Sequence, residues 1–507
     1  TMDFISTHLL TTILFFPVLA ALVILFIPGD QIKAIRWTAL LASLVPLGLS
    51  IWLWLGFDST AAGFQFEEQY EWYAAINSTF HIGVDGLSLS MVLLTTILTP
   101  LAILASFNIS DKVKAYMILF LLLETGMLGV FLALDLLIFF VFWEIGLVPM
   151  YFLINQWGSA NRNYASLKFF IYTMAGSLGL LLAIQLLGVR FQTYDIVTLA
   201  ESWSGLEVSP LLGLSTSTVK TVAFWAFVVA FAIKVPVWPF HTWLPDAHTE
   251  APTAGSMILA GVLLKLGAYG FLRLVLPFYP EEAAQFAGWL AFLAVMAIIF
   301  GAFGSYGQTD FKRLVAYSSI NHMGFVLLGI AAAAKAVGTL DATIALNGAV
   351  LQMFNHGLSA AGMFFLVGVI YERTHTRDLR QFGGLFPLVP VYGTILIFTS
   401  MASLGLPGLN GFVSEFMVVR GSWAILPVFT AVAMLGLLMT GAYILKGIKQ
   451  VLHGPLNEHW AHGEHRLTEI NIREILVMAP LMILILVIGV WPMWILDVIN
   501  KAMMMLF

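Results

Sequence analysis

Four ionisable residues lie inside long hydrophobic stretches of the sequence: Glu144, Lys234, Lys265 and Glu415. A charge at the centre of a bilayer is costly, and such a side chain usually pairs with another group or contacts water. Two lysines and several carboxylates are more than a bundle needs for bracing, because hydrophobic packing often stabilises as well as buried ion pairs do. The pattern therefore predicts a chain of proton-transfer groups.

Two of these residues could form a movable ion pair. If Glu144 approaches Lys234, the pair favours the charged lysine, and if the two separate, desolvation makes the lysine proton labile. The titration would then belong to the pair and not to either residue. Lys265 is a natural acceptor for the released proton. The alternative is that these residues form structural ion pairs.

Five further side chains are candidates for a proton relay: Glu124, His241, His248, His322 and His356. Histidine titrates near neutrality and can pass a proton between sites that water connects. His322 and His356 fit equally well as hydrogen-bonded core histidines. His241 and His248 lie in a loop-like segment, where fixing the local backbone is the better interpretation.

The elements that must position these groups are hydrophobic helices. The chain has 507 residues, 60% of them hydrophobic and 10% charged, with a mean hydropathy of +0.93. A helix of about 20 apolar residues spans the roughly 30 Å core of a bilayer. We therefore predict one polytopic all-α membrane domain, residues 1–507. It would have about 14 transmembrane helices: 9–27, 37–56, 87–106, 116–134, 137–156, 169–188, 221–243, 256–276, 284–304, 314–334, 345–371, 392–419, 426–445 and 475–496.

The distribution of Lys and Arg predicts the orientation. Alternate loops carry most of these residues, as loops on the cytoplasmic side do. Segment 58–85 has several glutamates but neither Lys nor Arg, which is typical of the outer face. We predict that both termini lie on the outer side.

Two of the predicted helices contain residues that break a helix. Pro236 and Pro239 follow Lys234 in helix seven, and Pro407, among several glycines, precedes Glu415 in helix twelve. Proline removes a backbone donor and disrupts the preceding turn. Since lipid cannot satisfy the freed groups, each break must face protein or a wet cavity.

The spacing of the breaks predicts an internal repeat. They lie five helices apart, so a second five-helix unit would enter the membrane inverted, which is a common transporter pattern. We predict inverted repeats of helices 4–8 and 9–13, with helices 1–3 in residues 1–110. The first repeat would occupy 111–280, the second 281–448, and a loop with helix 14 would occupy 449–507.

Other chemistries are poorly supported. The chain has no cysteine, which excludes disulfides, thiolate-held iron–sulfur clusters and thiolate zinc sites. The spacing of His241 and His248 is unlike that of a zinc site, so no metal is expected. The net charge of −5, without basic runs, argues against nucleic acid. Neither a Walker A motif nor a Rossmann glycine pattern appears in a suitable context.

One long run resembles a known family. Residues 231–256 read FAIKVPVWPFHTWLPDAHTEAPTAGS, which resembles the signature of the antiporter-like membrane subunits. That family includes the L, M and N subunits of respiratory complex I, large subunits of Mrp sodium/proton antiporters, and related hydrogenase subunits. Similar segments extend from Gly83 to beyond Glu469.

Within this family the sequence resembles the M type (chain 4 type) of NADH:quinone oxidoreductase. Glu415 stands where L, N and Mrp proteins typically carry lysine, and residues 371–377, YERTHTR, are similar to the M pattern. The chain also stops soon after helix fourteen, without the lateral helix of an L subunit. The resemblance implies that Glu144 and Lys234 form the coupling pair, Lys265 is the central relay and Glu415 the terminal proton site. It also favours His322 and His356 as relay members.

The resemblance further implies a setting. The chain would bind no cofactor, and FMN, iron–sulfur clusters and quinone would lie in other subunits. Its expected partners are the L-, N-, K-, J-, A- and H-type membrane subunits, the peripheral electron-transfer subunits and lipid. The expected location is a bacterial inner membrane or an equivalent energy-transducing membrane.

Three alternatives remain at this point. The first is a secondary antiporter component that exchanges Na⁺ or K⁺ for protons, which Glu415 disfavours. The second is a hydrogenase-linked subunit. The third is a structural scaffold, which the cost of two buried lysines disfavours.

Overall fold

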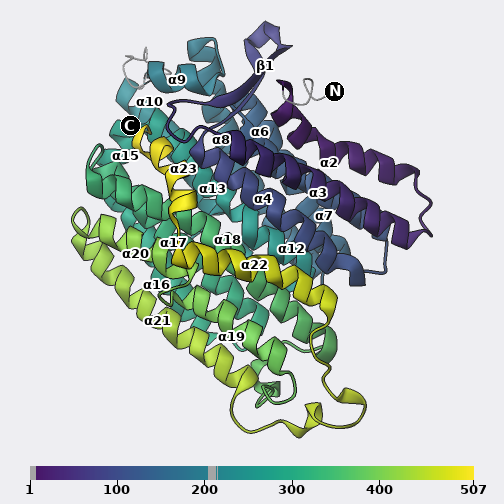
Figure 1. Cartoon of the computed structure of the whole chain (residues 1–507). Helices are drawn as coiled ribbons and strands as arrows, with labels where there is room; N and C mark the ends of the chain where they lie inside the picture. Colours follow the sequence, from purple (N-terminus) through teal and green to yellow (C-terminus); the bar gives the residue numbers. More distant parts are fainter. Residues whose placement is uncertain (1–6, 204–212, 214, 507) are drawn as a thin grey trace.

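The computed structural model describes residues 7–203, 213 and 215–506, which form a bundle of helices with one small β hairpin (Figure 1). Within this part, 13 helices are long and apolar enough to cross a membrane. The remaining predicted span, 392–419, corresponds to two shorter helices in sequence. The prediction of a helical, polytopic membrane protein is confirmed. The inverted repeats and the division of the chain remain predictions.

The first third of the chain contains the hairpin. Its elements are α2 (Leu9–Phe26), α3 (Ile32–Gly56), β1 (Gln65–Tyr73), β2 (Ser78–Val84), α4 (Gly86–Ala105), α5 (Val113–Leu132), α6 (Leu136–Ile145) and α7 (Leu147–Trp157). The middle of the chain contains α8 (Arg162–Phe191), α9 (Ile196–Trp203), α10 (Thr216–Lys234) and α11 (Trp243–Glu250).

A nearly continuous helix follows, Thr253–Phe278, which we call the Lys265 helix. It consists of α12 (Thr253–Ile258), a π turn (Leu259–Leu263), α13 (Leu264–Gly270), a second π turn (Phe271–Val275) and α14 (Leu276–Phe278). The rest of the chain forms α15 (Pro280–Gln285), α16 (Ala287–Gly307), α17 (Phe311–Lys335), α18 (Leu340–Thr374), α19 (Pro390–Leu404), α20 (Asn410–Trp423), α21 (Pro427–Leu452), α22 (Ile472–Val490) and α23 (Met493–Met504).

The hairpin lies in the segment that the sequence predicted as an outer loop. β1 and β2 are antiparallel, with Gln65 opposite Val84 and Tyr73 opposite Ser78. Most of β1 is exposed and rich in glutamate, so it lacks the alternating apolar pattern by which strands are recognised. β2 is held because the His81 carbonyl accepts from Leu134 N (2.8 Å), in the connection that precedes α6.

Both ends of the described chain lie on the face that carries the hairpin, which we call the hairpin face. Glu68 of β1 accepts from Leu10 N (2.8 Å) at the start of α2, and α23 packs against α4 near its first turn. Because both ends of the described chain lie on the same face, the arrangement fits an even number of membrane crossings. Which side of the membrane this face contacts remains a prediction.

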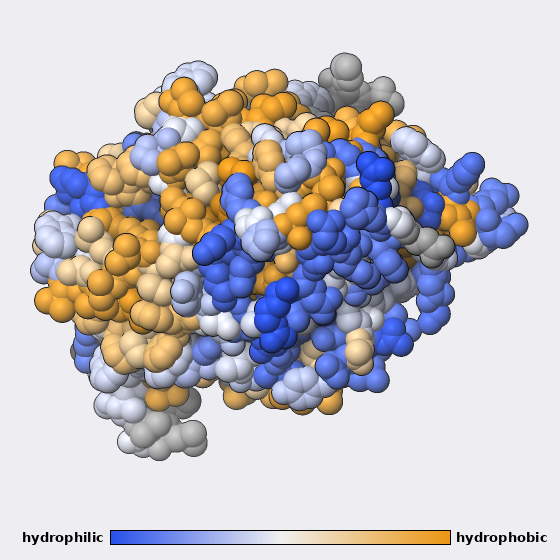
Figure 2. Space-filling model, turned by 90° about the horizontal axis from the view of Figure 1, so that it is seen from below, coloured by the Kyte–Doolittle hydropathy of each residue, from blue (hydrophilic) through white to orange (hydrophobic). Residues whose placement is uncertain are grey.

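The most buried helices lie at the centre of the bundle. The Lys265 helix and α18 are surrounded by protein over their most apolar windows, and α17 nearly so. Peripheral helices instead expose large apolar side chains, as a lipid-facing surface requires: Leu19, Leu25, Trp37, Leu55, Leu182, Val428, Leu438, Ile483 and Val490. Figure 2 shows broad hydrophobic areas beside a gathering of hydrophilic side chains on the face seen from below.

Candidate functional site

Lys265 occupies a fully buried position between two π turns. Its Nζ donates to the Ala260 carbonyl (2.5 Å) and lies 2.7 Å from Nδ1 of His356. A π turn interrupts the regular hydrogen-bond pattern of an α-helix and is frequent at functional sites. Here the lysine contacts the carbonyl of a residue in the preceding π turn. The Lys265 helix can approach α18 closely because Gly261 and Gly357 face each other's backbone.

His356 and His322 continue from Lys265 toward Glu415. Nε2 of His356 lies 3.2 Å from the Ser319 hydroxyl on α17. The two imidazole rings are 5.7 Å apart between centroids. Nδ1 of His322 lies 2.6 Å from Oε1 of Glu415. These contacts place four titratable side chains in one buried row that runs from the Lys265 helix through α18 and α17 to α20.

A small cavity lies between the two histidines. Its lining includes Ser318, Ser319, His322, His356 and Ser359, and its water-accessible volume is about 10 Å³. A space of this size holds roughly one water molecule, and a buried water needs two to four polar partners. The hydroxyl and imidazole groups supply such partners.

Glu415 follows the second helix break. α19 ends at Leu404 and α20 begins at Asn410, with Gly405 and Gly408 at φ +88° and +96° in the left-handed region. Glycine adopts this backbone without a steric cost. At the end of the break the Asn410 carbonyl accepts from the Asn355 side chain at 2.7 Å, whereas Leu406, Pro407 and Gly408 are exposed in this chain.

Glu415 itself is buried and well coordinated by its neighbours. Besides the contact with His322, Oε1 accepts from Nε2 of Gln352 at 3.0 Å. Oε1 of Gln352 in turn accepts from the Ser414 hydroxyl (2.6 Å). The amide is thereby fixed in one orientation, so that it donates to the carboxylate.

The first half of the bundle is organised differently. Lys234, at the end of α10, is buried with its Nζ 4.5 Å from the centroid of the Trp143 ring. Glu144 is the next residue, half-buried, and its Oε1 is enclosed without a hydrogen-bond partner in the described chain. Among the described residues, no ion pair within 4.0 Å joins Glu144 to Lys234. The predicted partners are thus neighbours, separated in this conformation.

The first helix break directly follows Lys234. α10 ends there, the Val237 amide donates to the Ala232 carbonyl (2.8 Å), and α11 begins at Trp243. The indole of Trp243 donates to the Ile233 carbonyl at 2.9 Å. The break is therefore closed by protein groups, as a polar backbone in a bilayer requires.

Asp246 anchors the segment after this break. Its two carboxylate oxygens bind Lys168 of α8 (2.7 Å) and Arg313 of α17 (2.9 Å). α11 is thereby tied to both halves of the bundle.

The remaining relay candidates form no hydrogen bond with the row in the described chain, although His248 is close enough to Lys265 and His356 for their charges to interact. Glu124 is fully buried in α5, and neither carboxylate oxygen has a partner in the described chain. His248 is also fully buried and stacks on Phe364 at 4.2 Å, with both ring nitrogens unpartnered there. His241 lies half-buried in the turn after the first break, near Tyr317.

Several residues around these sites were not recognised in the sequence. Gln352 and Ser319 are contacts of Glu415 and His356, and the signal for both was a polar side chain within a predicted span. A third interruption, at Gly146, separates α6 from α7 two residues after Glu144. The signal there was Pro149, which cannot donate to the Ile145 carbonyl.

Metal ligands are not gathered in the described part of the chain. Within it, no three His, Asp or Glu side chains are arranged so that they could hold a metal ion. The chemistry that this arrangement offers is proton transfer between nitrogen and oxygen atoms.

Comparison with known proteins identifies the family. The sequence profile described as NADH:quinone oxidoreductase/Mrp antiporter, transmembrane region, matches residues 133–440. NADH-quinone oxidoreductase subunit M of Rhodobacter capsulatus is 40% identical over 502 residues, covering 98% of this chain and 95% of that protein. The chain belongs to the NADH-quinone oxidoreductase subunit M family. The M-type resemblance seen in the sequence is therefore confirmed.

Members of the subunit M family extend beyond bacteria. NADH-ubiquinone oxidoreductase chain 4 of Arabidopsis thaliana is 38% identical over 489 residues, covering 96% of this chain and 94% of that one. A chain of respiratory complex I from Thermus thermophilus, solved with bound NADH, superposes with a TM-score of 0.84 at 27% identity. The match covers 98% of this chain and 99% of that chain.

The same fold occurs in an Mrp complex from Dietzia sp. The TM-score is 0.82 at 19% identity, covering 98% of this chain and 97% of that one, which shows a shared fold alone.

Proposed function

We propose that this chain moves protons as a membrane-arm subunit of a complex I-type NADH:quinone oxidoreductase. The observation that carries the proposal is the buried row from Lys265 through His356 and His322 to Glu415, with contacts of 2.7 and 2.6 Å at its two ends. Family membership supports the same conclusion.

The contacts suggest how a proton passes along the row. A charged Lys265 can only donate, so Nδ1 of His356 accepts and Nε2 carries the imidazole proton toward Ser319. Transfer from Lys265 to Nδ1 creates an imidazolium, which releases its Nε2 proton into the cavity. Water there can bridge to His322, whose Nδ1 contacts Glu415. The proton then reaches the carboxylate.

Glu144 and Lys234 supply the switch in this proposal. In the present conformation Lys234 contacts the face of Trp143, which stabilises a cation through the ring quadrupole. Approach of Glu144 would hold the proton on Lys234, and separation would release it toward Lys265. Glu124, His241 and His248 are proposed as further relay positions, because buried titratable atoms without partners are costly and usually mark a functional site.

The rest of the machinery would lie in other subunits. The chain binds no redox group in this proposal, and FMN, iron–sulfur clusters and quinone belong to its partners. These would be the L-, N-, K-, J-, A- and H-type membrane subunits and the peripheral electron-transfer subunits. The location would be a bacterial inner membrane, or an equivalent membrane, with the hairpin face outside.

Replacement of Glu144 with Ala tests the proposal. We expect proton pumping by the assembled, reconstituted complex to be lost while the complex remains folded, because Lys234 loses its movable partner. Quinone-linked proton uptake in proteoliposomes, normalised to the amount of intact complex on native gels, provides the measurement. Glu281→Ala removes an exposed carboxylate and is the matched control. Full pumping in the Glu144→Ala complex would overturn the proposed function.

A further inference from the structure

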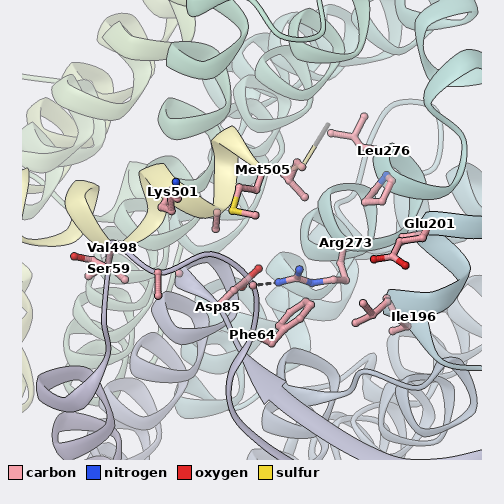
Figure 3. Close-up of a pocket in the computed structure, with 18 of the residues that line it drawn as sticks. Ser59, Phe64, Asp85, Ile196, Glu201, Arg273, Leu276, Val498, Lys501 and Met505 are labelled. Atoms are coloured by element: carbon pink, nitrogen blue, oxygen red, sulfur yellow. Dashed lines mark hydrogen bonds and ion pairs between the residues drawn. The ribbon is translucent and has the colours of Figure 1, made fainter.

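A large cavity opens on the hairpin face, away from the proton-transfer row. Its volume is about 540 Å³, and its walls come from the segment before β1, the start of α4, the end of the Lys265 helix and α23. Figure 3 shows Phe64, Asp85, Arg273, Lys501 and Met505 among the side chains around it. Water from this face of the membrane can therefore reach the far end of the helix that carries Lys265.

Arg273 forms the floor of this cavity. Its side chain is only 6% exposed, and Nη2 donates to Oδ1 of Asp85 at 2.6 Å (Figure 3). Nε donates to the Tyr269 hydroxyl at 3.0 Å. The guanidinium carbon lies 4.9 Å from the Phe64 ring centroid and 5.3 Å from that of Tyr269. The guanidinium is thus contacted by Asp85, Tyr269 and Phe64.

Asp85 is the counter-charge of this arginine. Burial raises the pKa of Asp85, but the charge of Arg273, its hydrogen bond and the hydrogen bonds from Ser88 together outweigh this, so that the pKa lies below its usual value. Asp85 also caps α4, because its Oδ1 accepts from Ser88 N at 3.0 Å. The ionised pair therefore persists at neutral pH.

Tyr269 lies between Arg273 and Lys265 on one face of the helix. Lys265, Tyr269 and Arg273 are spaced by four residues, which places them near one face of the helix. Eight residues of helix rise by about 12 Å. Tyr269 is fully buried, and its hydroxyl donates to the Phe131 carbonyl at 3.0 Å.

This geometry poses a problem for a proton pump. Water that extended from the cavity past Tyr269 would connect Lys265 to the hairpin face and let protons return down their gradient. A fixed positive charge at a constriction repels protons and other cations, as in pores that exclude protons. Arginine is suited to this task because it stays charged at every physiological pH.

We propose that the charged guanidinium of Arg273, packed between Phe64 and Tyr269 and oriented by Asp85, is a plug that stops protons from passing between the hairpin-face cavity and Lys265. The proposal rests on the proposed function, since it assigns Lys265 as the group that must be isolated. Arg273 is a positioning residue here. It accepts and releases no proton itself.

Arg273→Gln is the decisive variant, because glutamine retains hydrogen-bonding groups for Asp85 and Tyr269 but has no charge. The assembled complex is reconstituted in liposomes that contain a pH-sensitive dye. A valinomycin-driven potassium diffusion potential is then applied without any electron donor. We expect a passive proton leak about tenfold above the wild-type complex, as removal of a barrier of about 1.4 kcal/mol gives. Arg273→Lys retains the charge, and we expect its passive proton leak to equal that of the wild-type complex.

Two further variants separate a charged plug from a structural brace. Asp85→Asn keeps an α4 cap, because asparagine is as good a cap as aspartate, and leaves the cation in place, so the leak stays at the wild-type level. Arg420→Gln removes the cation of an exposed ion pair, Arg420–Asp341, at 2.7 Å and is the matched control.

The outcomes are distinct. A leak in Arg273→Gln equal to that of the wild type overturns the plug, and so does an equal leak in Asp85→Asn and Arg273→Gln. If Arg273→Gln assembles poorly, its leak is divided by the amount of intact complex. That value is then compared with the leaks of Asp85→Asn and the wild type, and the same two outcomes apply. Normal pumping by Glu144→Ala would instead overturn the proposed function, and it does so in a separate measurement with turnover.

Discussion

The two charged regions of the bundle differ in how their polar atoms are satisfied. In the second region, Lys265, His356, His322 and Glu415 have hydrogen-bond partners, and most contacts are shorter than 3.3 Å. In the first, Lys234 lies over an aromatic ring and Glu144 has an oxygen enclosed without a partner. The first helix break directly follows Lys234, and the second precedes Glu415.

The difference indicates two physical tasks. A satisfied network holds its geometry, because each buried polar group that lost its partner would cost about 1–3 kcal/mol. It suits repeated proton transfer along a fixed row. A buried carboxylate and lysine that are near each other but unbonded have a second arrangement available, the ion pair. The first region is therefore suited to switching and the second to conduction.

The largest expected effect tests whether the second region is one continuous row. Lys265→Met removes the only group of the row that contacts His356 from the Lys265 helix. Loss of a proton-transfer group costs about 100-fold or more, so we expect pumping to fall below detection while electron transfer to an artificial acceptor continues. Lys335→Met removes an exposed lysine and provides the control. Unchanged pumping with Lys265→Met would contradict the row.

A smaller effect is expected at the other end of the row. Glu415→Lys loses the contact with His322, and hydrogen bonds to charged groups contribute about 1.5–3 kcal/mol. Since the site keeps an ionisable group, we expect pumping to fall by about tenfold and not to vanish. Initial rates of proton uptake per electron measure this. A loss of pumping as complete as that of Lys265→Met would show that pumping requires the carboxylic acid at position 415 itself, and not only an unbroken row of ionisable groups.

The smallest effect concerns how the first region is anchored to the hairpin. His81 bridges Asp195 (2.8 Å) and Glu67 (2.9 Å), and β2 is bonded to the connection before α6, which carries Glu144. Burial lowers the pKa of His81, but its bonds with Asp195 and then Glu67 outweigh this and raise the pKa above 6.5. The stabilisation is therefore full below pH 6.5 and is lost as the pH rises through the raised pKa.

Hydrogen exchange of the β2 amides measures this anchoring. We expect faster exchange above the raised pKa of His81, with exchange corrected for its intrinsic pH dependence. Asp195 has a lowered pKa, because burial, which raises it, is outweighed by the hydrogen bond with His81. Its contribution is lost only in strong acid. His81→Gln should remove the alkaline transition, and a transition that persists in this variant would show that another group controls the hairpin.

Much of the fold followed from residue types alone. Long apolar runs predicted the membrane helices, because a bilayer accepts few other structures. The hairpin was missed because β1 is an exposed strand rich in glutamate, and its pairing with β2 depends on a partner that local pattern does not show. The π turns beside Lys265 were likewise invisible in the local pattern, and the first of them lies where Gly261 packs against Gly357 of α18.

The sequence by itself determined which residues could carry protons. Lys265 and Glu415 are conspicuous in apolar stretches because the cost of a charge in lipid makes each one informative. Only the tertiary structure decided which groups meet: it joined Lys265 to His356 and His322 to Glu415, left Glu144 apart from Lys234, and set Arg273 against Asp85, 188 residues away. Side chains so distant in the chain come within hydrogen-bond reach through helix packing, and no local pattern contains that information.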